Sequence, residues 1–357
     1  MDPAALLPTP DAIPVDWGWF HVLLLLTFLV HILLMSTMFG SAFIGFISYF
    51  QKDGTANPCS ESVSHTLPFI IAFTVNFGVA PLLFVQVLYG HLFYTSSILM
   101  ATYWLSLVGV LVAAYALSYL LKYRYGRLGW LRLPIFMVIV SLFALIAFAF
   151  VNNIGMMQNP STWPRYFSEP RGLLLNLQDP MQVPRYFHFV FGSVALGGLA
   201  IALYFHWQQK QGDWTGMDWV RRGCRWFSFA TMANILLGLW FLFTLPQGTL
   251  SFENLHTQAL VTALSVGILT AIPAIRAGLA GRVVATLWWT LATMVSMVLA
   301  RDLLRQILLA PWFSPAELEV KPEFTPLYLF LAVFIVGLAL ITWMVPFTLR
   351  NCRGGQV

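Results

Sequence analysis

Two histidines lie inside hydrophobic segments of this sequence, where an ionisable side chain is costly. His31 lies 14 residues into the segment 17–50, about 20 Å along a helix at 1.5 Å per residue. His188 lies at the start of an apolar run within "QVPRYFHFVFGSVALGG", residues 182–198. Intramembrane histidines usually face the interior of a helix bundle, and imidazole is the usual axial ligand of b-type haem. His31 and His188 are therefore the first candidates for ligands of a haem iron.

The other five histidines lie closer to the ends of hydrophobic segments. His21, His91 and His256 are within a turn or two of a segment end, where they are either cofactor-binding residues or ordinary interfacial side chains. His65 follows a serine at a segment start, so a capping role is favoured. His206 shares a helix face with His188, which suits a second cofactor level, but a structural role near the headgroups is favoured.

Small residues follow His188 on the same predicted helix face. Gly192 and Ala195 stand four and seven residues after it, with Ser193 nearby. Their small volume leaves room for a flat macrocycle beside the imidazole. The same pattern also suits the close packing of two helices in a membrane.

The composition indicates that these residues lie in a lipid bilayer. The chain is 59% hydrophobic and 9% charged, whereas a soluble domain has about 25% charged residues. The 357 residues are predicted to form one all-α integral membrane domain. We expect nine transmembrane helices, at 17–50, 66–92, 97–121, 133–152, 185–207, 226–245, 257–275, 283–309 and 325–348.

The basic residues predict the orientation of these helices. Thirteen of the nineteen Lys and Arg residues fall on one side: Lys52, Lys122, Arg124, Arg127, Arg132, Lys210, Arg221, Arg222, Arg225, Arg276, Arg282, Arg350 and Arg353. The positive-inside rule places that side in the cytoplasm, with the N-terminus outside and the C-terminus inside. The excess of basic charge thus reflects orientation, and no nucleic-acid partner is expected.

The remaining loops and the cysteines complete the outline. The outer loops 152–184 and 310–326 are rich in Pro and aromatic residues, so ordered lids are expected. No repeat of 20 to 50 residues stands out. The three cysteines are far apart and form no CxxC motif, which argues against covalent haem attachment.

A charged cluster closes the eighth segment. Arg301 and Arg305 are four residues apart on one helix face, and Asp302 reaches Arg305. If the helix continues to Leu309, these arginines are buried and need an anionic partner such as a haem propionate. Arg185, three residues before His188, is a candidate for the same role. The alternative is that the helix stops near residue 300 and the arginines lie at the interface.

Four segments together resemble a known family. "HILLMSTMFGSAFIG" (31–45), "VNFGVAPLLFVQVLYG" (75–90), "GMMQNP" (155–160) and "LQDPMQVPRYFHFVFGSVALGG" (177–198) occur in this order. They are similar in order and rough spacing to signature segments of subunit I of cytochrome bd quinol oxidase. The resemblance covers residues 17–245, and the last three spans, 246–357, are more divergent.

The resemblance implies cofactors, partners and a location. His31 resembles the haem ligand of the first helix, and His188 the ligand of the low-spin b haem near the outer face. The family implies one to three b haems, a quinol or quinone, and a second membrane subunit. It further implies a multi-pass protein of the bacterial inner membrane that serves the respiratory chain.

The sequence departs from the family at the positions that serve oxygen chemistry and quinol binding. Gln86 stands eight residues after Gly78, where the family has a glutamate. The family's long quinol-binding loop is replaced by the short connection 245–256. No methionine occurs in residues 257–274, where the family places a haem ligand, and its G-R-Q-P-W motif is reduced to "LRQIL", 304–308. The family's nearby glutamate ligand is also missing.

These observations lead to one expected function and two alternatives. We expect a b-type haem electron-transfer subunit and oxidoreductase component. It would take electrons from a quinol, with its pocket rebuilt by loop 152–184, and pass them to a periplasmic cytochrome or other redox protein. His91 and His256 are the candidates for the second ligand of His188. The alternatives are a divergent terminal oxidase that reduces oxygen and a haem-free structural or transport subunit.

Overall fold

Nine long α helices make up most of the part of the chain that the structure describes. The computed structural model describes residues 3–50, 57–168 and 170–354, with side chains up to residue 346. The helices are α1 (Trp17–Ser48), α2 (Pro58–Leu99), α3 (Ala101–Leu128), α4 (Arg132–Gln158), α5 (Gln182–Lys210), α6 (Met217–Phe243), α7 (Leu255–Leu279), α8 (Val283–Leu309) and α9 (Thr325–Gly354). In the described ranges, the only β pairing is an isolated bridge between Ile13 and Val320. The expected all-α membrane bundle is confirmed.

Local sequence signals explain where several helices begin. The side chains of Asp16, Asn57 and Asn254 each accept a backbone N–H from the first turn of α1, α2 and α7, which satisfies donors that a helix start leaves unpaired. The capping role predicted for His65 is wrong, because α2 begins at Pro58, seven residues earlier. α2 is also longer than expected, and it bends at Tyr89, whose φ of −134° is not helical.

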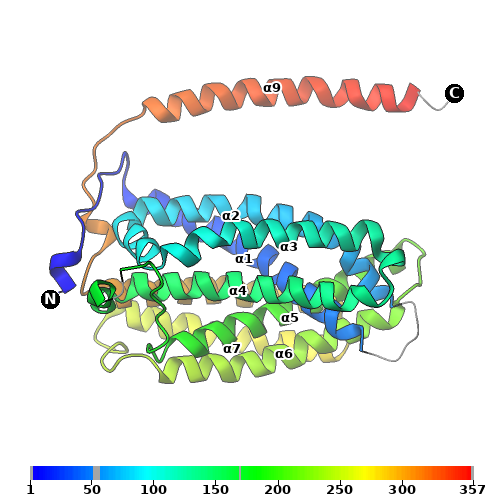
Figure 1. Ribbon diagram of the computed structural model, residues 1–357, viewed down its shortest axis with the longest axis horizontal. Helices are drawn as coiled ribbons and strands as arrows, with labels where there is room; N and C mark the ends of the chain where they lie inside the picture. Colours follow the sequence, from blue (N-terminus) through cyan, green and yellow to red (C-terminus); the bar gives the residue numbers. More distant parts are fainter. Residues whose placement is uncertain (1–2, 51–56, 169, 355–357) are drawn as a thin grey trace.

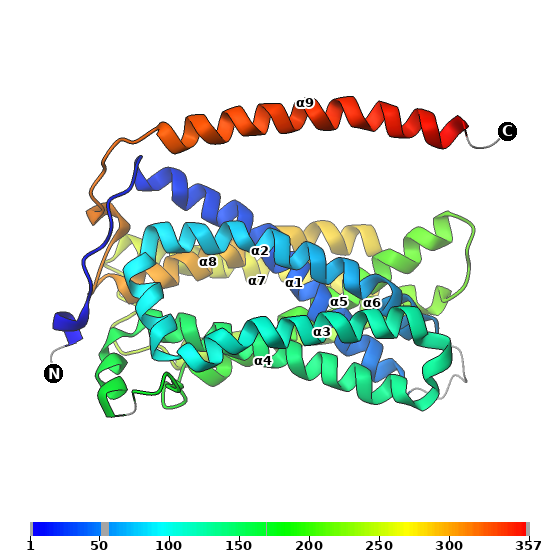
Figure 2. The ribbon, with the colours of Figure 1, turned by 45° about the horizontal axis from the view of Figure 1, so that its top comes forward.

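The helices run up and down in sequence order. α3 and α4 are joined only by the short 3₁₀ helix η2 (Gly129–Leu131), so 101–158 reads as one continuous hydrophobic segment. α1 lies at the centre and crosses its neighbours obliquely, as expected for an over-long span (Figures 1 and 2). Since direction alternates from helix to helix, α1 and α5 run parallel. α1 packs mainly on α2 and α5, and α5 mainly on α6 and α1.

Glycines bring α1 and α5 into backbone contact. A Cβ on Gly40 would overlap the carbonyl oxygen of Ser193, and a Cβ on Gly197 would overlap the backbone of Gly40. Nearby, the hydroxyl of Ser193 bonds that of Ser36 at 3.3 Å. One separation of 157 residues relates three pairs on these two helices: His31 and His188, Ser36 and Ser193, Gly40 and Gly197. Equivalent residues that meet each other are the mark of a two-fold relation.

The small residues after His188 therefore serve helix packing. Gly198 of α5 faces α6, where its Cβ would lie 2.8 Å from the carbonyl oxygen of Gly223. A Cβ on Gly223 would in turn lie 2.6 Å from the carbonyl oxygen of Gly198. Of the small residues named after His188, Ser193 lies at the close approach to Gly40 of α1, as expected for close helix packing. Gly192 differs, because its Cβ would meet the side-chain amide of Asn234 at 3.1 Å.

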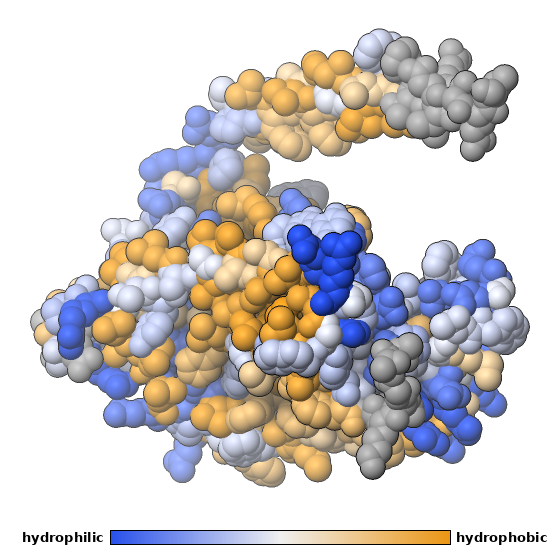
Figure 3. Space-filling model, turned by 45° about the vertical axis from the view of Figure 1, so that its right-hand side comes forward, coloured by the Kyte–Doolittle hydropathy of each residue, from blue (hydrophilic) through white to orange (hydrophobic). Residues whose placement is uncertain are grey.

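Apolar side chains cover a large area in the middle of the face drawn in Figure 3. Leu105 is 75% exposed and Phe243 87% exposed, which is favourable only in contact with lipid. Of the thirteen basic residues assigned to one side, Lys52 lies outside the described residues, as do the side chains of Arg350 and Arg353. The remaining ten lie around the α3–α4, α5–α6 and α7–α8 connections. The opposite end carries the start of α1.

Among their described residues, both segments expected as lids contain a short 3₁₀ helix, Pro160–Ser168 in one and Pro315–Glu317 in the other, and one boundary needs correction. Residues 152–158 were predicted to be loop but form the last turns of α4, where Asn152 and Asn153 are fully buried. Beyond them, the indole of Trp163 is buried and donates to the carbonyl of Met156 at 2.9 Å. In the segment after α8, Ile13 is held by backbone hydrogen bonds to Glu319 and Lys321.

α9 stands apart from the other helices. Figures 1 and 2 both show it separated from the bundle along its length. No residue from 325 to 346 is buried. An apolar helix with no buried residue among those described contributes little to the packing energy of its own chain.

We expect Gly197→Ala to destabilise the bundle, because the added methyl group would force α1 and α5 apart. Overpacking of this kind costs about 1–3 kcal/mol. Gly109→Ala on α3 is the matched control, since a Cβ there meets nothing within 4 Å. The measurement is the apparent melting temperature of each variant in detergent. Equal melting temperatures would contradict the close approach of α1 and α5.

Ending the chain after residue 322 should leave the bundle intact. The shortened protein keeps the bridge between Ile13 and Val320 and loses only the exposed α9. We expect the same melting temperature as the full chain, with helicity reduced by one helix. A large fall in melting temperature would show that α9 packs on the bundle.

Candidate functional site

His31 is held in one orientation by α2. Its Nδ1 lies 3.1 Å from the carbonyl oxygen of Thr74. A carbonyl oxygen only accepts hydrogen bonds, so Nδ1 carries the proton and Nε2 presents a lone pair. Gly78 follows Thr74 by four residues, and a Cβ there would lie 2.7 Å from Cε1 of His31. The imidazole thus packs directly against the backbone at Gly78.

His188 is held in the same way by α6. Its Nδ1 lies 3.1 Å from the carbonyl oxygen of Asn234. Gly238 again follows by four residues, and a Cβ there would lie 3.0 Å from Cε1 of His188. Within the part of the chain that the structure describes, neither imidazole has a hydrogen-bond partner at Nε2. We call each set of histidine, accepting carbonyl and glycine a histidine bracket.

The two brackets are related by the two-fold arrangement of α1 and α5. Each histidine lies nine residues before the glycine at the helix crossing, Gly40 or Gly197, which is about 13.5 Å at 1.5 Å per residue. Because α1 and α5 run parallel, both imidazoles lie on the same side of the crossing and at a similar depth. The brackets are therefore equivalent positions on two different helix pairs.

Several buried polar atoms near the His188 bracket lack a hydrogen-bond partner among the described residues. They include the side-chain oxygen of Asn234, both amide atoms of Gln182 and Nη1 of Arg185. Gln182 and Arg185 converge on Gly155, where a Cβ would lie 3.1 Å from Oε1 of Gln182 and 3.5 Å from Nη1 of Arg185. Buried polar atoms are nearly always paired in native proteins. Next to the other bracket, the hydroxyl of Thr74 is also unpaired.

A second cluster joins α1 to α8 near the end of the bundle. Nε2 of His21 lies 2.6 Å from Oδ2 of Asp302. The same oxygen accepts the amide of Gln306 at 2.7 Å, and Arg305 pairs with Oδ1. Arg305 is 1% exposed, and α8 continues to Leu309. The alternative in which the helix stops near residue 300 is therefore wrong, and Arg305 is buried, whereas Arg301 is partly exposed.

The other candidate residues lie separately. Arg301 stacks on Phe28 of α1, 4.1 Å from the ring centroid, and does not join Asp302. His91 packs edge-on against Phe313 at 4.4 Å between ring centroids. His256 is exposed at the start of α7 and bonds only the Asn254 cap among the described residues. His21 thus has a partner that the sequence did not indicate.

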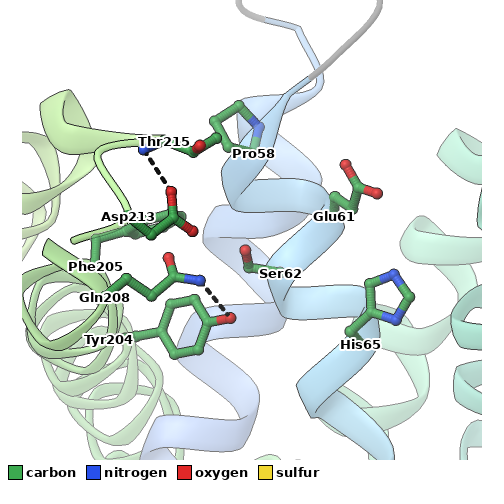
Figure 4. A pocket seen from close by; sticks show the side chains of 9 residues that line it. All are labelled: Pro58, Glu61, Ser62, His65, Tyr204, Phe205, Gln208, Asp213 and Thr215. Carbon is green, nitrogen blue, oxygen red and sulfur yellow. Dashed lines mark hydrogen bonds between the residues drawn. The ribbon is translucent and has the colours of Figure 1, made fainter. Parts of the chain in front are cut away.

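The basic end of the bundle has a surface pocket between α2 and the α5–α6 connection (Figure 4). It is lined by Glu61, His65, Tyr204 and Asp213 among others. Figure 4 shows Glu61 and His65 on the far side of α2 from Asp213, so the ionisable groups do not converge. A hydrogen bond from the backbone N–H of Thr215 lowers the pKa of Asp213.

The features that sequence reasoning missed are backbone groups and long-range partners. The carbonyls of Thr74 and Asn234 that accept these hydrogen bonds are backbone groups. Every residue has such a group, so the sequence does not single these two residues out. The pairing of His21 with Asp302 joins positions 281 residues apart. For one bracket the sequence held a weak indication, because Gly78 lies in "NFGVA", part of a segment that carries the family resemblance.

Comparisons with known proteins do not identify a relative. No family model matches the sequence, and no curated protein or solved structure gives a significant match. The described residues contain no cluster of three or more His, Cys, Asp or Glu side chains that could hold a metal ion.

Replacing Asp302 with asparagine should destabilise the protein strongly. The change removes the charge that pairs with buried Arg305, and breaking a buried ion pair costs about 3–5 kcal/mol. Glu319→Gln is the matched control, because its 2.9 Å pair with Lys321 is exposed and worth about 0–1 kcal/mol. Apparent melting temperatures of the two variants give the comparison. Similar values would mean that Arg305 does not depend on Asp302.

Proposed function

We propose that the chain is a b-type haem electron-transfer subunit, with His31 and His188 as axial ligands through Nε2. The pair of equivalent histidine brackets carries this proposal. Histidines that ligate a metal almost always donate the other ring N–H to a carbonyl or carboxylate. That bond fixes the tautomer and the ring orientation, as it does here at Thr74 and Asn234.

The residues around the brackets fit a haem. The porphyrin supplies four ligands to its own iron, so one or two imidazoles suffice and no cluster of three protein ligands is required. Bare backbone at Gly78 and Gly238 keeps side chains away from the imidazoles. Near His188, the unpaired Nη1 of Arg185 and amide of Gln182 suit a propionate. Arg301 and Arg305 are further candidates for this role.

When bound, a b haem supplies one-electron transfer. The chain's own residues orient the imidazoles, and helix packing leaves each imidazole only partly exposed. Two equivalent brackets support at least two haems within the expected one to three. His91 and His256 stay the candidates for the second ligand of His188.

The same proposal includes a donor and partners. The electron donor is a quinol from the membrane, and the acceptor is a periplasmic cytochrome or other redox protein. The basic connections then face the cytoplasm of a bacterium, and both brackets lie toward the periplasmic side of the crossing. The separate α9 supports a second membrane subunit, because none of its apolar residues from 325 to 346 is buried in the bundle.

A reduced-minus-oxidised spectrum with haem extraction tests the proposed function. The purified chain should give a b-type Soret band, and His188→Ala should remove the signal of one haem. His206→Ala is the control, because His206 lies on the same helix five turns away and is assigned no ligand role. A chain without any Soret band would refute the haem proposal. An unchanged spectrum of His188→Ala would exclude His188 as a ligand.

A further inference from the structure

A cavity of about 470 Å³ lies between α1, α7 and α8. Its walls are mostly apolar and include Leu25, Ala263, Val266 and Leu299. His21, Asp302 and Gln306 form its polar end. This volume and this mixture of an apolar wall with a few polar groups are typical of small-molecule sites.

The cavity opens toward the lipid. Val266 and Leu299 line it and are also 45% and 42% exposed on the apolar surface. An occupant can therefore enter sideways from the bilayer, with its polar part at the cluster and an apolar tail left in the membrane. A water-soluble substrate has no such route along these side chains.

The polar end offers hydrogen-bond acceptors. Nε2 of His21 faces the carboxylate of Asp302, so it carries the proton, and Nδ1 is an acceptor. The amide nitrogen of Gln306 donates to the same carboxylate, which leaves its carbonyl oxygen as a second acceptor. Nδ1 of His21 has no partner among the residues that the structure describes. The occupant that fits is a donor of hydrogen bonds.

We propose that this cavity binds a membrane hydroquinone, with one hydroxyl on Nδ1 of His21. A hydroquinone has two hydroxyl donors on a flat ring and an apolar tail, which matches both ends of the cavity. The oxidised quinone has only acceptors and fits the polar end less well. A phospholipid phosphate is disfavoured, because Asp302 faces the cavity and Arg305 does not line it. The inference rests on the proposed function for its electron acceptor.

The pair of His21 and Asp302 then serves as the proton acceptor. Oxidation of a hydroquinone to a quinone releases two electrons and two protons. The O–H bond breaks and an N–H bond forms at Nδ1, while the carboxylate of Asp302 stabilises the charged imidazole, as in other His–Asp pairs. The imidazole releases this proton to water at the end of the bundle and takes the second in turn.

A b haem held by His31 or His188 would accept the electrons one at a time, as the oxidant named by the proposed function. His21 and His31 are ten residues apart on α1, which is about 15 Å along the helix. The cavity is thus on the same helix as one bracket. Asp302 is a positioning residue, because it acts through the tautomer of His21.

Photolabelling tests the binding site without requiring haem. The purified chain, in lipid discs free of quinone, is irradiated with a short-tailed hydroquinone that carries a diazirine, and labelled peptides are mapped by mass spectrometry. We expect label on α1, α7 and α8, and about tenfold more label from the hydroquinone than from its oxidised form. Tenfold corresponds to about 1.4 kcal/mol, the scale of one good hydrogen bond.

Two kinds of variant sharpen the test. Val266→Trp fills the mouth from the lipid side and should abolish labelling, while Val112→Trp on lipid-exposed α3 should leave it unchanged. Asp302→Asn lets the new amide donate to Nε2 of His21, so Nδ1 becomes the donor. The preference should then shift toward the oxidised quinone. His21→Ala should remove the preference without moving the label if Asp302→Asn fails to fold.

The outcomes separate this inference from the proposed function. Label at the cavity in a chain that contains no haem would support the binding site and refute the haem subunit. Label confined to 159–181 or elsewhere, in a chain that contains haem, would overturn the inference alone. A phospholipid retained on α7 and α8 that the hydroquinone cannot displace would also overturn it, as would labelling unaffected by Val266→Trp.

Discussion

The backbone contact between α1 and α5 determines the arrangement of the whole bundle. At Gly40 and Gly197 the two helices approach until no side chain fits between them, and Ser36 bonds Ser193 nearby. This contact fixes the crossing point of two parallel helices, each with a histidine nine residues earlier. It also fixes where α2 and α6 must pack, because each covers the opposite face of its partner. Both brackets follow from this one close approach.

The physical cost of an imidazole in a membrane explains the rest of each bracket. A polar ring surrounded by hydrocarbon needs a partner for its N–H. A helix carbonyl supplies that partner without a polar side chain, provided that the neighbouring helix has room for the ring. Glycine at the next turn gives this room at Gly78 and Gly238. The hydrogen bond at Nδ1 thus stabilises the ring. It also leaves a lone pair at Nε2 that is able to bind a metal ion.

Hydropathy predicted the helices because each span must be apolar to cross lipid, and six of the nine expected spans fall inside observed helices. The spans 17–50 and 226–245 ran two residues past the ends of α1 and α6, and the span 97–121 began four residues before α3. The charged cluster on α8 was predicted through the spacing of Asp302 and Arg305. The link from Asp302 to His21 was not, because it depends on how α1 and α8 pack. The role of Thr74 and Asn234 as hydrogen-bond acceptors was not predicted either, because the acceptor is a backbone carbonyl and does not depend on the residue type. The two-fold relation was hidden, because few residues match between the halves apart from His, Ser and Gly at equal spacing.

The central claim is that the two brackets hold haem iron at Nε2 of His31 and His188. An electron cryo-microscopy map of the full chain, purified from its own membrane, tests it most directly. We expect flat density of a macrocycle joined to Nε2 of each imidazole, with the Nδ1 bonds to Thr74 and Asn234 in place. A map in which both imidazoles are covered by side chains or lipid, without such density, would contradict the account.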